Sequence, residues 1–289
     1  MPDPLDRVTV VLVTFHSAHC LDALHALLAH CPHIVVSDNG SSDGTPGQVR
    51  SRWPQAQVLE HGRNLGFGAA NNRALAQVKT PYAFLLNPDC EVTPDGLREL
   101  VRVADDMPDA AIVAPQLCAA SGQPEANYRW PGTVWASRGP GADAPACVGF
   151  VVGAAMLFRM ERFSDLGFFD ERFFLYYEDD DLCLRLFQNQ RPMIVWPAVQ
   201  AIHRSRGSVK GNTPWRSEYL RGYHHAQSKL TYTVKHRSLA LARSQRWRVL
   251  LTTSLALPLR AIAWSPRLLA RMAGRWMGLA QWRPYEPRS

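Results

Sequence analysis

The feature that most constrains the fold of this chain is an alternation of apolar runs and helical patterns through its first 105 residues. The apolar runs are short and rich in Val, Ile and Leu, which is typical of strands buried in a parallel sheet. Strands are predicted at residues 8–14, 33–37, 57–60 and 81–86, with helices at residues 17–31, from the 64–72 segment to about residue 78, and at 94–105. This alternation predicts an α/β fold, in which crossovers place helices on the faces of a mainly parallel sheet.

Polar residues stand where several of these strands end. A turn rich in Gly and Ser begins at Asp38, a second polar loop spans residues 64–68, and Asp89 follows the fourth strand. Ligands of parallel sheets bind outside the carboxyl ends of the strands, so we expect a ligand site here. Asp38 either makes the turn or accepts a hydrogen bond from a nucleobase or ribose, and its position alone does not decide between these roles.

Asp89 sits on a rigid corner because Pro88 fixes the backbone before it. One carboxylate can hold a hard divalent cation, since Mg²⁺ takes few protein ligands and shares its remaining positions with phosphate and water. His203, at the end of a later predicted strand, is a candidate further ligand, although a lone histidine is more often structural.

The loop at residues 64–68 also has the first two glycines, Gly66 and Gly68, of a dinucleotide-binding pattern. Asp89 lies about 20 residues further on, where that pattern expects a ribose-binding acid. However, Asn71 occupies the position of the third glycine, and the pattern follows the third strand rather than the first. Asn64 and Asn71 fit helix capping and polar ligand contacts better than a dinucleotide site.

Four consecutive acids at residues 178–181 follow an aromatic run and precede apolar residues at helical spacing. The helix dipole favours acids in the first turn, which explains one or two of them, but four in a row repel one another. Asp181 and Arg185 stand four apart and are expected to pair. Crowding against aromatic residues raises the pKa of at least one remaining acid, as in a general base. Glu178 and Asp179, nearest the preceding loop, are the candidates for catalysis.

The composition is that of an ordinary globular protein, with 46% hydrophobic and 20% charged residues among 289. The net charge of +7 is unevenly distributed, because residues 235–289 carry +10 and the rest of the chain carries −3. The six cysteines form no CxxC pair, which favours reduced, buried thiols in a cytosolic protein. The chain begins with no basic-then-apolar leader.

The basic tail, residues 235–289, also holds four Trp and many Leu. We interpret it as interfacial helices, broken at Pro258 and Pro266, that lie in the headgroup region of an anionic membrane. A helical cap packed on the main domain is the alternative. Nucleic-acid binding is not expected, because no nucleic-acid module accompanies the charge. The longest uncharged apolar run, residues 249–259, is too short to span a bilayer.

Taken together, these motifs resemble glycosyltransferase family 2, in particular its rhamnosyltransferase-like branch. The resemblance covers about residues 8–210 and rests on the order of segments at residues 13–15, 37–45, 64–72, 86–89, 153–158, 168–174 and 178–179. It implies a GT-A type fold, with a Rossmann-like, mainly parallel sheet flanked by helices and followed here by a helical basic tail. We therefore expect a catalytic domain at residues 1–234 and the tail at 235–289.

The resemblance implies an inverting, metal-dependent transfer of a sugar from a nucleotide-diphosphate donor. The expected sugar is a rhamnose-like deoxyhexose, the expected donor a dTDP- or UDP-sugar, and the expected acceptor a hydroxyl of a glycan or a polyprenyl-diphosphate-linked lipid. Such a reaction belongs to cell-surface polysaccharide synthesis. We expect the enzyme in the cytoplasm, peripheral on the inner face of the cell membrane.

Roles for single residues follow from the same resemblance. Asp38 matches the acid that binds base and ribose, Asp89 the last acid of the DxD metal motif, and Asp179 the catalytic base. The other implied site residues are Glu178 in catalysis, His203 with the metal, and Thr14, Phe15, Asn64, Gly66, Asn71 and Asn87 with the nucleotide. Independently of the resemblance, the Gly, Ser and basic content of residues 204–215 predicts a lid over the diphosphate, with Arg204, Arg206 and Lys210 as its cations.

One departure from the family pattern concerns the metal. The first acid of the DxD motif is Asn87 here, so binding of Mg²⁺ or Mn²⁺ depends on Asp89 with fewer protein charges. Asp179 would take a proton from the acceptor hydroxyl as it attacks the anomeric carbon from the face opposite the diphosphate. No Cys–His or Ser–His–Asp spacing offers a protein nucleophile, which favours inversion.

Two other classes of protein remain alternatives. A sugar nucleotidyltransferase would carry a phosphate loop rich in Gly and Arg after its first strand, where this chain has His-Ser-Ala-His at residues 16–19. A non-catalytic homologue that only binds sugar nucleotides would be expected to lose Asp89 or Asp179, and both are present.

Overall fold

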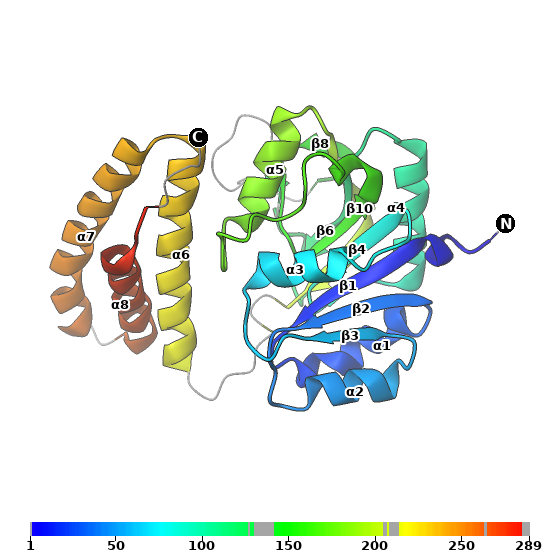
Figure 1. Ribbon diagram of the computed structural model, residues 1–289, viewed down its shortest axis with the longest axis horizontal. Coiled ribbons are helices and arrows are strands. Elements are labelled where there is room, and N and C mark those ends of the chain that lie inside the picture. The colour runs from blue at the N-terminus through cyan, green and yellow to red at the C-terminus, as the bar shows by residue number, and fades with distance from the viewer. Residues whose placement is uncertain are drawn as a thin grey trace. The chain divides into compact units, whose positions relative to one another are not determined.

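The computed structural model describes residues 2–126, 128–129, 142–204, 207, 214–262 and 265–284 (Figure 1). The chain divides into two compact units. The sheet unit comprises Met1–Phe169 and Asp179–Lys210, and the helical unit comprises Asp170–Glu178 and Gly211–Ser289. The boundary expected between residues 234 and 235 falls within a helix of the second unit, α6 (Pro214–His236).

A parallel block of strands begins the sheet, as the alternation of the sequence predicts. Within the described residues the sheet has nine strands in the order β3-β2-β1-β4-β10-β6-β11-β5, with β8 paired beside β11. Strands β1 to β4 pair in parallel, whereas β10 runs antiparallel to both β4 and β6. The strands are β1 Val8–Thr14, β2 His33–Asp38, β3 Gln57–Glu60, β4 Tyr82–Leu86, β5 Cys90–Glu91, β6 Ile112–Cys118, β8 Ala146–Val148, β10 Ala155–Arg159 and β11 Met193–His203. Two further strands, β7 (Tyr128–Arg129) and β9 (Phe150–Val151), form a separate small sheet.

Helices cover both faces of the large sheet. Alternate side chains of a strand point to opposite faces, so Val10 and Leu12 of β1 enter one apolar core while Val11 enters the other. The first core also receives side chains of α1 (Leu21–Leu28), α2 (Thr45–Arg52) and α4 (Pro94–Asp106). The second receives those of α3 (Phe67–Leu75) and α5 (Glu178–Gln188). Burial on both faces explains why these strands are apolar throughout.

Three elements differ from the sequence prediction. Helix α2 was not predicted, because Val49 is the one aliphatic side chain that it buries and its apolar period is therefore too weak. The apolar run at residues 148–158, which by its composition predicts a single strand, contains two strands, β9 and β10, separated by a turn that contains Gly153. The break expected at Pro258 is wrong, because α7 (Leu239–Ile262) continues through it and packs along α6 and α8 (Pro266–Gln281). The start of α8 at Pro266 was predicted.

The helical unit is built from α6, α7 and α8, labelled in Figure 1. Glycines let α6 and α8 cross at very short distance. A Cβ placed on Gly274 would lie 1.9 Å from the carbonyl oxygen of Tyr219, and one on Gly222 would lie 2.0 Å from that of Arg271. The apolar core between the helices contains Ala226, Leu230, Val234, Ala242, Leu279 and Trp282.

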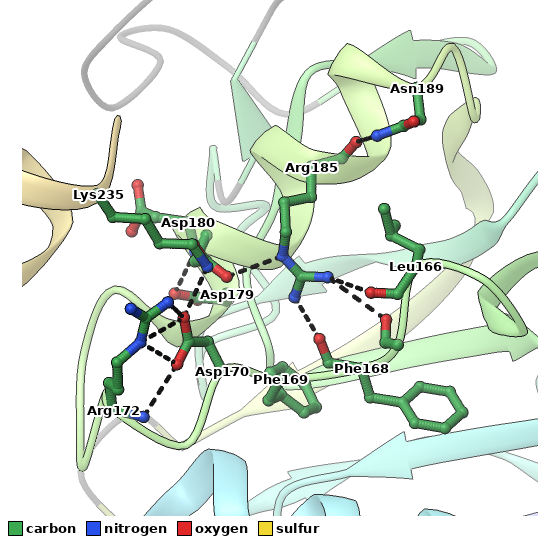
Figure 2. A network of polar contacts seen from close by, with 12 residues as sticks. Leu166, Phe168, Phe169, Asp170, Arg172, Asp179, Asp180, Arg185, Asn189 and Lys235 are labelled. Carbon is green, nitrogen blue, oxygen red and sulfur yellow. Dashed lines mark hydrogen bonds and ion pairs between the residues drawn. The ribbon is translucent and has the colours of Figure 1, made fainter. Parts of the chain in front are cut away.

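Helix α6 also holds the segment that precedes the acid cluster. Lys235 Nζ lies 2.7 Å from Asp170 Oδ2 (Figure 2). Ser228 Oγ donates to the carbonyl of Leu175 at 2.9 Å. Arg172 pairs with the same Asp170 carboxylate. Burial alone would raise the pKa of Asp170, but the hydrogen bonds from Arg172 and Lys235 lower it well below its usual range.

The thiols agree with the expectation from the sequence. All six cysteines are free, and five of them are buried while Cys147 is exposed. A helix both long enough and apolar enough to cross a bilayer does not occur in the described part of the chain.

Candidate functional site

The predicted site residues lie at one edge of the sheet. In the parallel pair of β1 and β2, Thr14 stands opposite Asp38 at the carboxyl ends of both strands. Strand β4 flanks β1 on its other side and ends at Leu86, directly before Asn87. The chain thus crosses from one side of β1 to the other at this point, which is where ligands bind in such sheets.

Asp38 organises the loop that follows β2. Its carboxylate is buried and accepts four hydrogen bonds, from Thr14 Oγ1 at 2.8 Å, Ser41 Oγ at 2.6 Å, and the N–H groups of Gly40 and Ser41 at 3.1 and 2.8 Å. These contacts are those of a turn-making aspartate. The nucleoside-binding role of Asp38 stays a prediction, and so does that of Phe15, whose N–H donates to Ser17 Oγ at 3.2 Å.

Asn39 joins this loop to the loop before α3, a role that the sequence did not reveal. Its side chain donates to the carbonyl of Gly66 at 3.2 Å and accepts from the N–H of Leu65 at 3.2 Å. Gly40 supports the approach, because its φ is +78° and a Cβ there would lie 2.9 Å from the Arg63 nitrogen. An aspartate–asparagine–glycine turn suits this geometry, but the partner loop is not visible in the sequence.

The asparagines predicted to bind the nucleotide differ in surroundings. Asn64 is exposed, and its Oδ1 accepts from the N–H of Gly66 at 2.9 Å, which shapes the loop before α3. Asn71 is buried and donates to the carbonyl of Phe67 within its own helix at 3.0 Å. Asn64 therefore lies where a ligand can reach it, whereas Asn71 is engaged inside the protein.

The corner after β4 is a hydrogen-bonded turn. The N–H of Asn87 donates to the carbonyl of Ala154 at 2.8 Å, and the N–H of Cys90 donates back to the carbonyl of Asn87 at 3.0 Å. This geometry places Asp89 beside the end of β11, where His203 pairs with Cys90. His203 Nε2 lies 3.7 Å from Asp89 Oδ1, so the structure brings together the two residues predicted to hold a metal.

These two donors suit part of a divalent cation site. One carboxylate oxygen and one imidazole nitrogen converge, and a substrate diphosphate and water would supply the other ligands of Mg²⁺ or Mn²⁺. A third acid, histidine or cysteine does not join them among the described residues. The other oxygen of Asp89 accepts from the N–H of Gly207 at 2.9 Å, which connects the site to the chain after β11.

The acid cluster begins α5, as predicted. Asp179 is half-buried, and its carboxylate accepts from the N–H of Gly153 at 3.2 Å and from the N–H of Asp180 at 2.9 Å. Burial, and then the neighbouring Asp180 carboxylate, raise the pKa of Asp179 to about 6, against the lowering effect of those N–H groups and of Arg129. A carboxyl with this pKa is ionised at neutral pH and basic enough to accept a proton.

The other acids of the cluster differ from Asp179. Asp181 is fully buried and pairs with Arg185 at 2.9 Å, as its spacing predicted. Arg185 also donates to the carbonyls of Leu166 and Phe168, which anchors α5 (Figure 2). Glu178 is 6% exposed, so Asp179 is the more accessible of the two catalytic candidates.

The turn between β9 and β10 connects the acid cluster to the corner at Asp89. Gly153 donates to Asp179, and the adjacent Ala154 accepts from Asn87. A Cβ on Gly153 would lie 3.6 Å from both Asp179 Cβ and Phe67 Cε1, so the first residue of α3 also reaches this turn. The small residues at positions 153–155 predict a close approach of backbone or ligand, but no sequence pattern identifies Asp179 as the approaching group.

The predicted lid falls mostly outside the described residues. Arg206 and Lys210 are not described, as is true of most of residues 204–215. Arg204 is described: its side chain pairs with Glu91, and its N–H donates to the carbonyl of Asp89 at 2.9 Å. The role of these cations at a diphosphate stays a prediction.

Known proteins resemble this chain in sequence and in structure. The N-acetylglucosaminyl-diphospho-decaprenol L-rhamnosyltransferase of Mycobacterium tuberculosis is 28% identical over 84% of this chain and 87% of that protein. The low-salt glycan biosynthesis hexosyltransferase Agl10 of Haloferax volcanii is 26% identical over 69% of this chain and 67% of its own length. The mannosyltransferase PcManGT of Pyrobaculum calidifontis, solved with GDP-Man and Mn²⁺, superposes with a TM-score of 0.57 at 17% identity, over 97% of this chain and 88% of that one.

The structural likeness confirms the predicted GT-A type fold, with a helical C-terminal region after the sheet. The model of the family described as "Glycosyl transferase family 2" matches residues 9–166, which are more than half of the chain. That range contains Asp38, Asp89 and the turn at Gly153. The chain therefore belongs to glycosyl transferase family 2 and is a glycosyltransferase.

Proposed function

We propose that this glycosyltransferase moves a rhamnose-like deoxyhexose from a dTDP- or UDP-sugar to a hydroxyl of a polyprenyl-diphosphate-linked acceptor, with inversion at the anomeric carbon. The single observation that carries the mechanism is the setting of Asp179. This carboxyl is half-buried, has a pKa raised to about 6, and is joined through Gly153 and Ala154 to the corner at Asp89. The acceptor class is supported by the mycobacterial relative, whose name specifies a decaprenol-linked substrate.

The chemistry follows from this arrangement. The Asp179 carboxylate takes the proton of the acceptor hydroxyl while the oxygen of that hydroxyl bonds to the anomeric carbon. The bond from that carbon to the donor diphosphate breaks on the opposite face, and the nucleoside diphosphate leaves with the electron pair. Inversion follows because a single displacement occurs with no protein nucleophile.

The other end of the site handles the donor. Asp89 and His203 would hold a divalent cation, which when bound offsets negative charge on the diphosphate. Asp38 and Asn39 fix the loops that follow β2 and precede α3, and a nucleoside would bind at these strand ends, with the exposed Asn64 as one candidate contact.

The helical unit supports attachment to a membrane surface. On α7, Trp247, Leu251 and Leu255 repeat every four residues and are 68%, 63% and 66% exposed, so they form one apolar stripe on the helix. Arg243 and Arg248 beside the stripe are exposed, and α7 contains no acid. We propose that this face lies in the headgroup region of an anionic membrane, where a lipid-linked acceptor would also be found.

A donor and acceptor screen tests the function. Purified protein is incubated with Mg²⁺ or Mn²⁺ and a panel of UDP-, dTDP- and GDP-sugars, and release of nucleoside diphosphate is measured with and without a polyprenyl-diphosphate-linked sugar. Release that depends on the lipid-linked acceptor and is fastest with a deoxyhexose donor supports the proposal. Release of pyrophosphate from a nucleoside triphosphate and a sugar phosphate, with formation of a nucleotide-sugar, would instead identify a nucleotidyltransferase.

A further inference from the structure

The small sheet of β7 and β9 lies against the acid cluster. Arg129 of β7 pairs with Phe150 of β9, and the carbonyl of Arg129 accepts from the N–H of Gly149 at 2.8 Å. The aromatic and basic residues at positions 128–131 would, from the sequence alone, be interpreted as an exposed binding platform. Tyr128 is instead 4% exposed, and residues 130–131 lie outside the described part of the chain.

The small sheet and the turn after β9 contact the first turns of α5 at three points. The N–H of Val151 donates to Cys183 Sγ, and the Cys183 thiol donates to the carbonyl of Val151, both at 3.5 Å. Two residues after the strand, the N–H of Gly153 donates to Asp179 Oδ2 at 3.2 Å. The third contact comes from the paired strand, because the side chain of Arg129 reaches Asp180.

Arg129 is held tightly in this position. Its Nη1 lies 2.6 Å from Asp180 Oδ1, and its guanidinium carbon lies 3.6 Å from the centroid of the Phe150 ring. The side chains of Arg129 and Asp180 are only 20% and 18% exposed. An ion pair shielded from water and stacked on an aromatic ring is well fixed, because both contacts require the same guanidinium orientation.

Asp180 acts on its neighbour Asp179 in two ways. Its N–H donates to Asp179 Oδ1 at 2.9 Å, which orients the carboxylate together with Gly153. Its own carboxylate is a like charge beside Asp179 and disfavours ionisation of that group, second only to burial. Arg129 works in the opposite direction, because a nearby cation favours the ionised form.

We propose that Arg129 is a positioning residue for the reaction: it fixes Asp180 and offsets its charge, so that Asp179 is held in orientation and ionised at the pH of catalysis. The proposal rests on the proposed function in assigning the base to Asp179. The groups that act electrostatically on Asp179 are Arg129 from β7 and Asp180 on α5, with the Cys183 thiol one turn further along that helix. Burial raises the pKa of that thiol, so it stays neutral.

The experiment compares Arg129→Gln, Arg129→Lys and Asp180→Asn by two independent readouts. The first is the pH profile of kcat/KM, and the second is the titration of the Asp179 carboxyl carbon by NMR, assigned with Asp179→Asn. Arg129→Gln should move both midpoints upward by about one pH unit, because a nearby cation is lost. Asp180→Asn should move both downward, and Arg129→Lys should restore most of the wild-type profile.

A matched control is Arg162→Gln, which removes the surface pair of Arg162 with Asp109 at 2.7 Å and should leave both readouts unchanged. If Arg129→Gln lowers kcat at every pH and leaves the midpoints unmoved, the role of Arg129 is merely structural and the proposal fails. The proposal also fails if Arg129→Gln and Asp180→Asn move the two midpoints in the same direction. If the carboxyl titration moves as expected and the rate profile does not follow, Arg129 tunes Asp179 but Asp179 is not the base. Failure of the proposal for Arg129 is thus distinguishable from failure of the proposal that Asp179 is the base.

Discussion

Four consecutive carboxyls take different roles because their surroundings differ. Asp181 is buried against Arg185 and anchors its helix, and Asp180 is bound to Arg129. Glu178 is almost fully buried, which leaves Asp179 as the half-buried member with a raised pKa. The four environments differ in the way that is usual where several carboxyls share a site, and this difference supports the proposal that Asp179 is the proton acceptor.

The pKa of Asp179 predicts the pH dependence of the reaction. Only the ionised carboxyl accepts a proton, and its pKa is raised to about 6. The value of kcat/KM should therefore be constant above that pH and fall about tenfold for each pH unit below it. Steady-state kinetics between pH 4.5 and 8 checks this. An acid limb centred near pH 4, the ordinary value for an aspartate, would contradict the raised pKa.

Variants of Asp89 and Asp38 should separate the effect of metal binding from the effect of nucleoside binding. Asp89→Asn removes the carboxylate that faces His203, so the stimulation of donor binding by Mn²⁺ should disappear. Asp38→Ala removes the acceptor of four loop hydrogen bonds and should weaken nucleoside diphosphate binding with or without metal. Titration calorimetry measures both. Metal stimulation that survives in Asp89→Asn would refute the metal role of this residue.

At the scale of elements, the closest packing in the helical unit is the crossing of α6 and α8 at glycines. Gly274→Ala would put a methyl group 1.9 Å from the carbonyl oxygen of Tyr219, so the helices must separate. Overpacking of this kind costs about 1–3 kcal/mol, and we expect a lower free energy of unfolding by that amount. Chemical denaturation followed by circular dichroism gives the value.

The matched control for this prediction is Gly47→Ala in α2. A Cβ there has no atom within 4 Å, and alanine is the better helix former, so this variant should be neutral or more stable by up to about 1 kcal/mol. Equal stability of Gly274→Ala and Gly47→Ala would show that the α6–α8 crossing relaxes at no cost.

The elements that the sequence predicted best are those with strong periods. Strands β1 and β3 begin and end at the predicted residues, whereas α2 has too few buried side chains to give a helical pattern. Among the candidate site residues, Asp89, His203 and the acid cluster lie at or beside the ends of strands and helices, and the sequence predicted them there. Arg129 and Asn39 were not, because their partners Asp180 and Gly66 are distant in sequence and no local pattern links them.

At the scale of the whole molecule, the chain joins a mildly acidic sheet unit to a helical unit with a basic C-terminal part. The stripe of Trp247, Leu251 and Leu255 on α7 is the feature that suggests a surface partner. Because these side chains are exposed, replacing all three by Ser removes apolar contact without opening the core of the helical unit.

We expect the variant with all three residues replaced by Ser to lose membrane attachment. Wild-type protein should float with vesicles that contain anionic lipid and be released at high salt, while the triple variant should stay in the aqueous fraction. Phe187→Ser, which removes a 44% exposed apolar side chain from α5 in the sheet unit, serves as the control and should float like wild type. If wild type and the triple variant float alike, the stripe is not the membrane contact.

A comparison of Asp179→Asn with Glu178→Gln tests whether Asp179 is the base of this glycosyltransferase. Nucleoside diphosphate release is measured with donor and lipid-linked acceptor at pH 7.5, and donor affinity is measured by calorimetry on the same samples. We expect Asp179→Asn to bind donor normally but to turn over about 10²–10⁴-fold more slowly, which is the usual contribution of a general base. Glu178→Gln should keep most of its activity. Abolished turnover in Glu178→Gln with activity preserved in Asp179→Asn would contradict this assignment of the base.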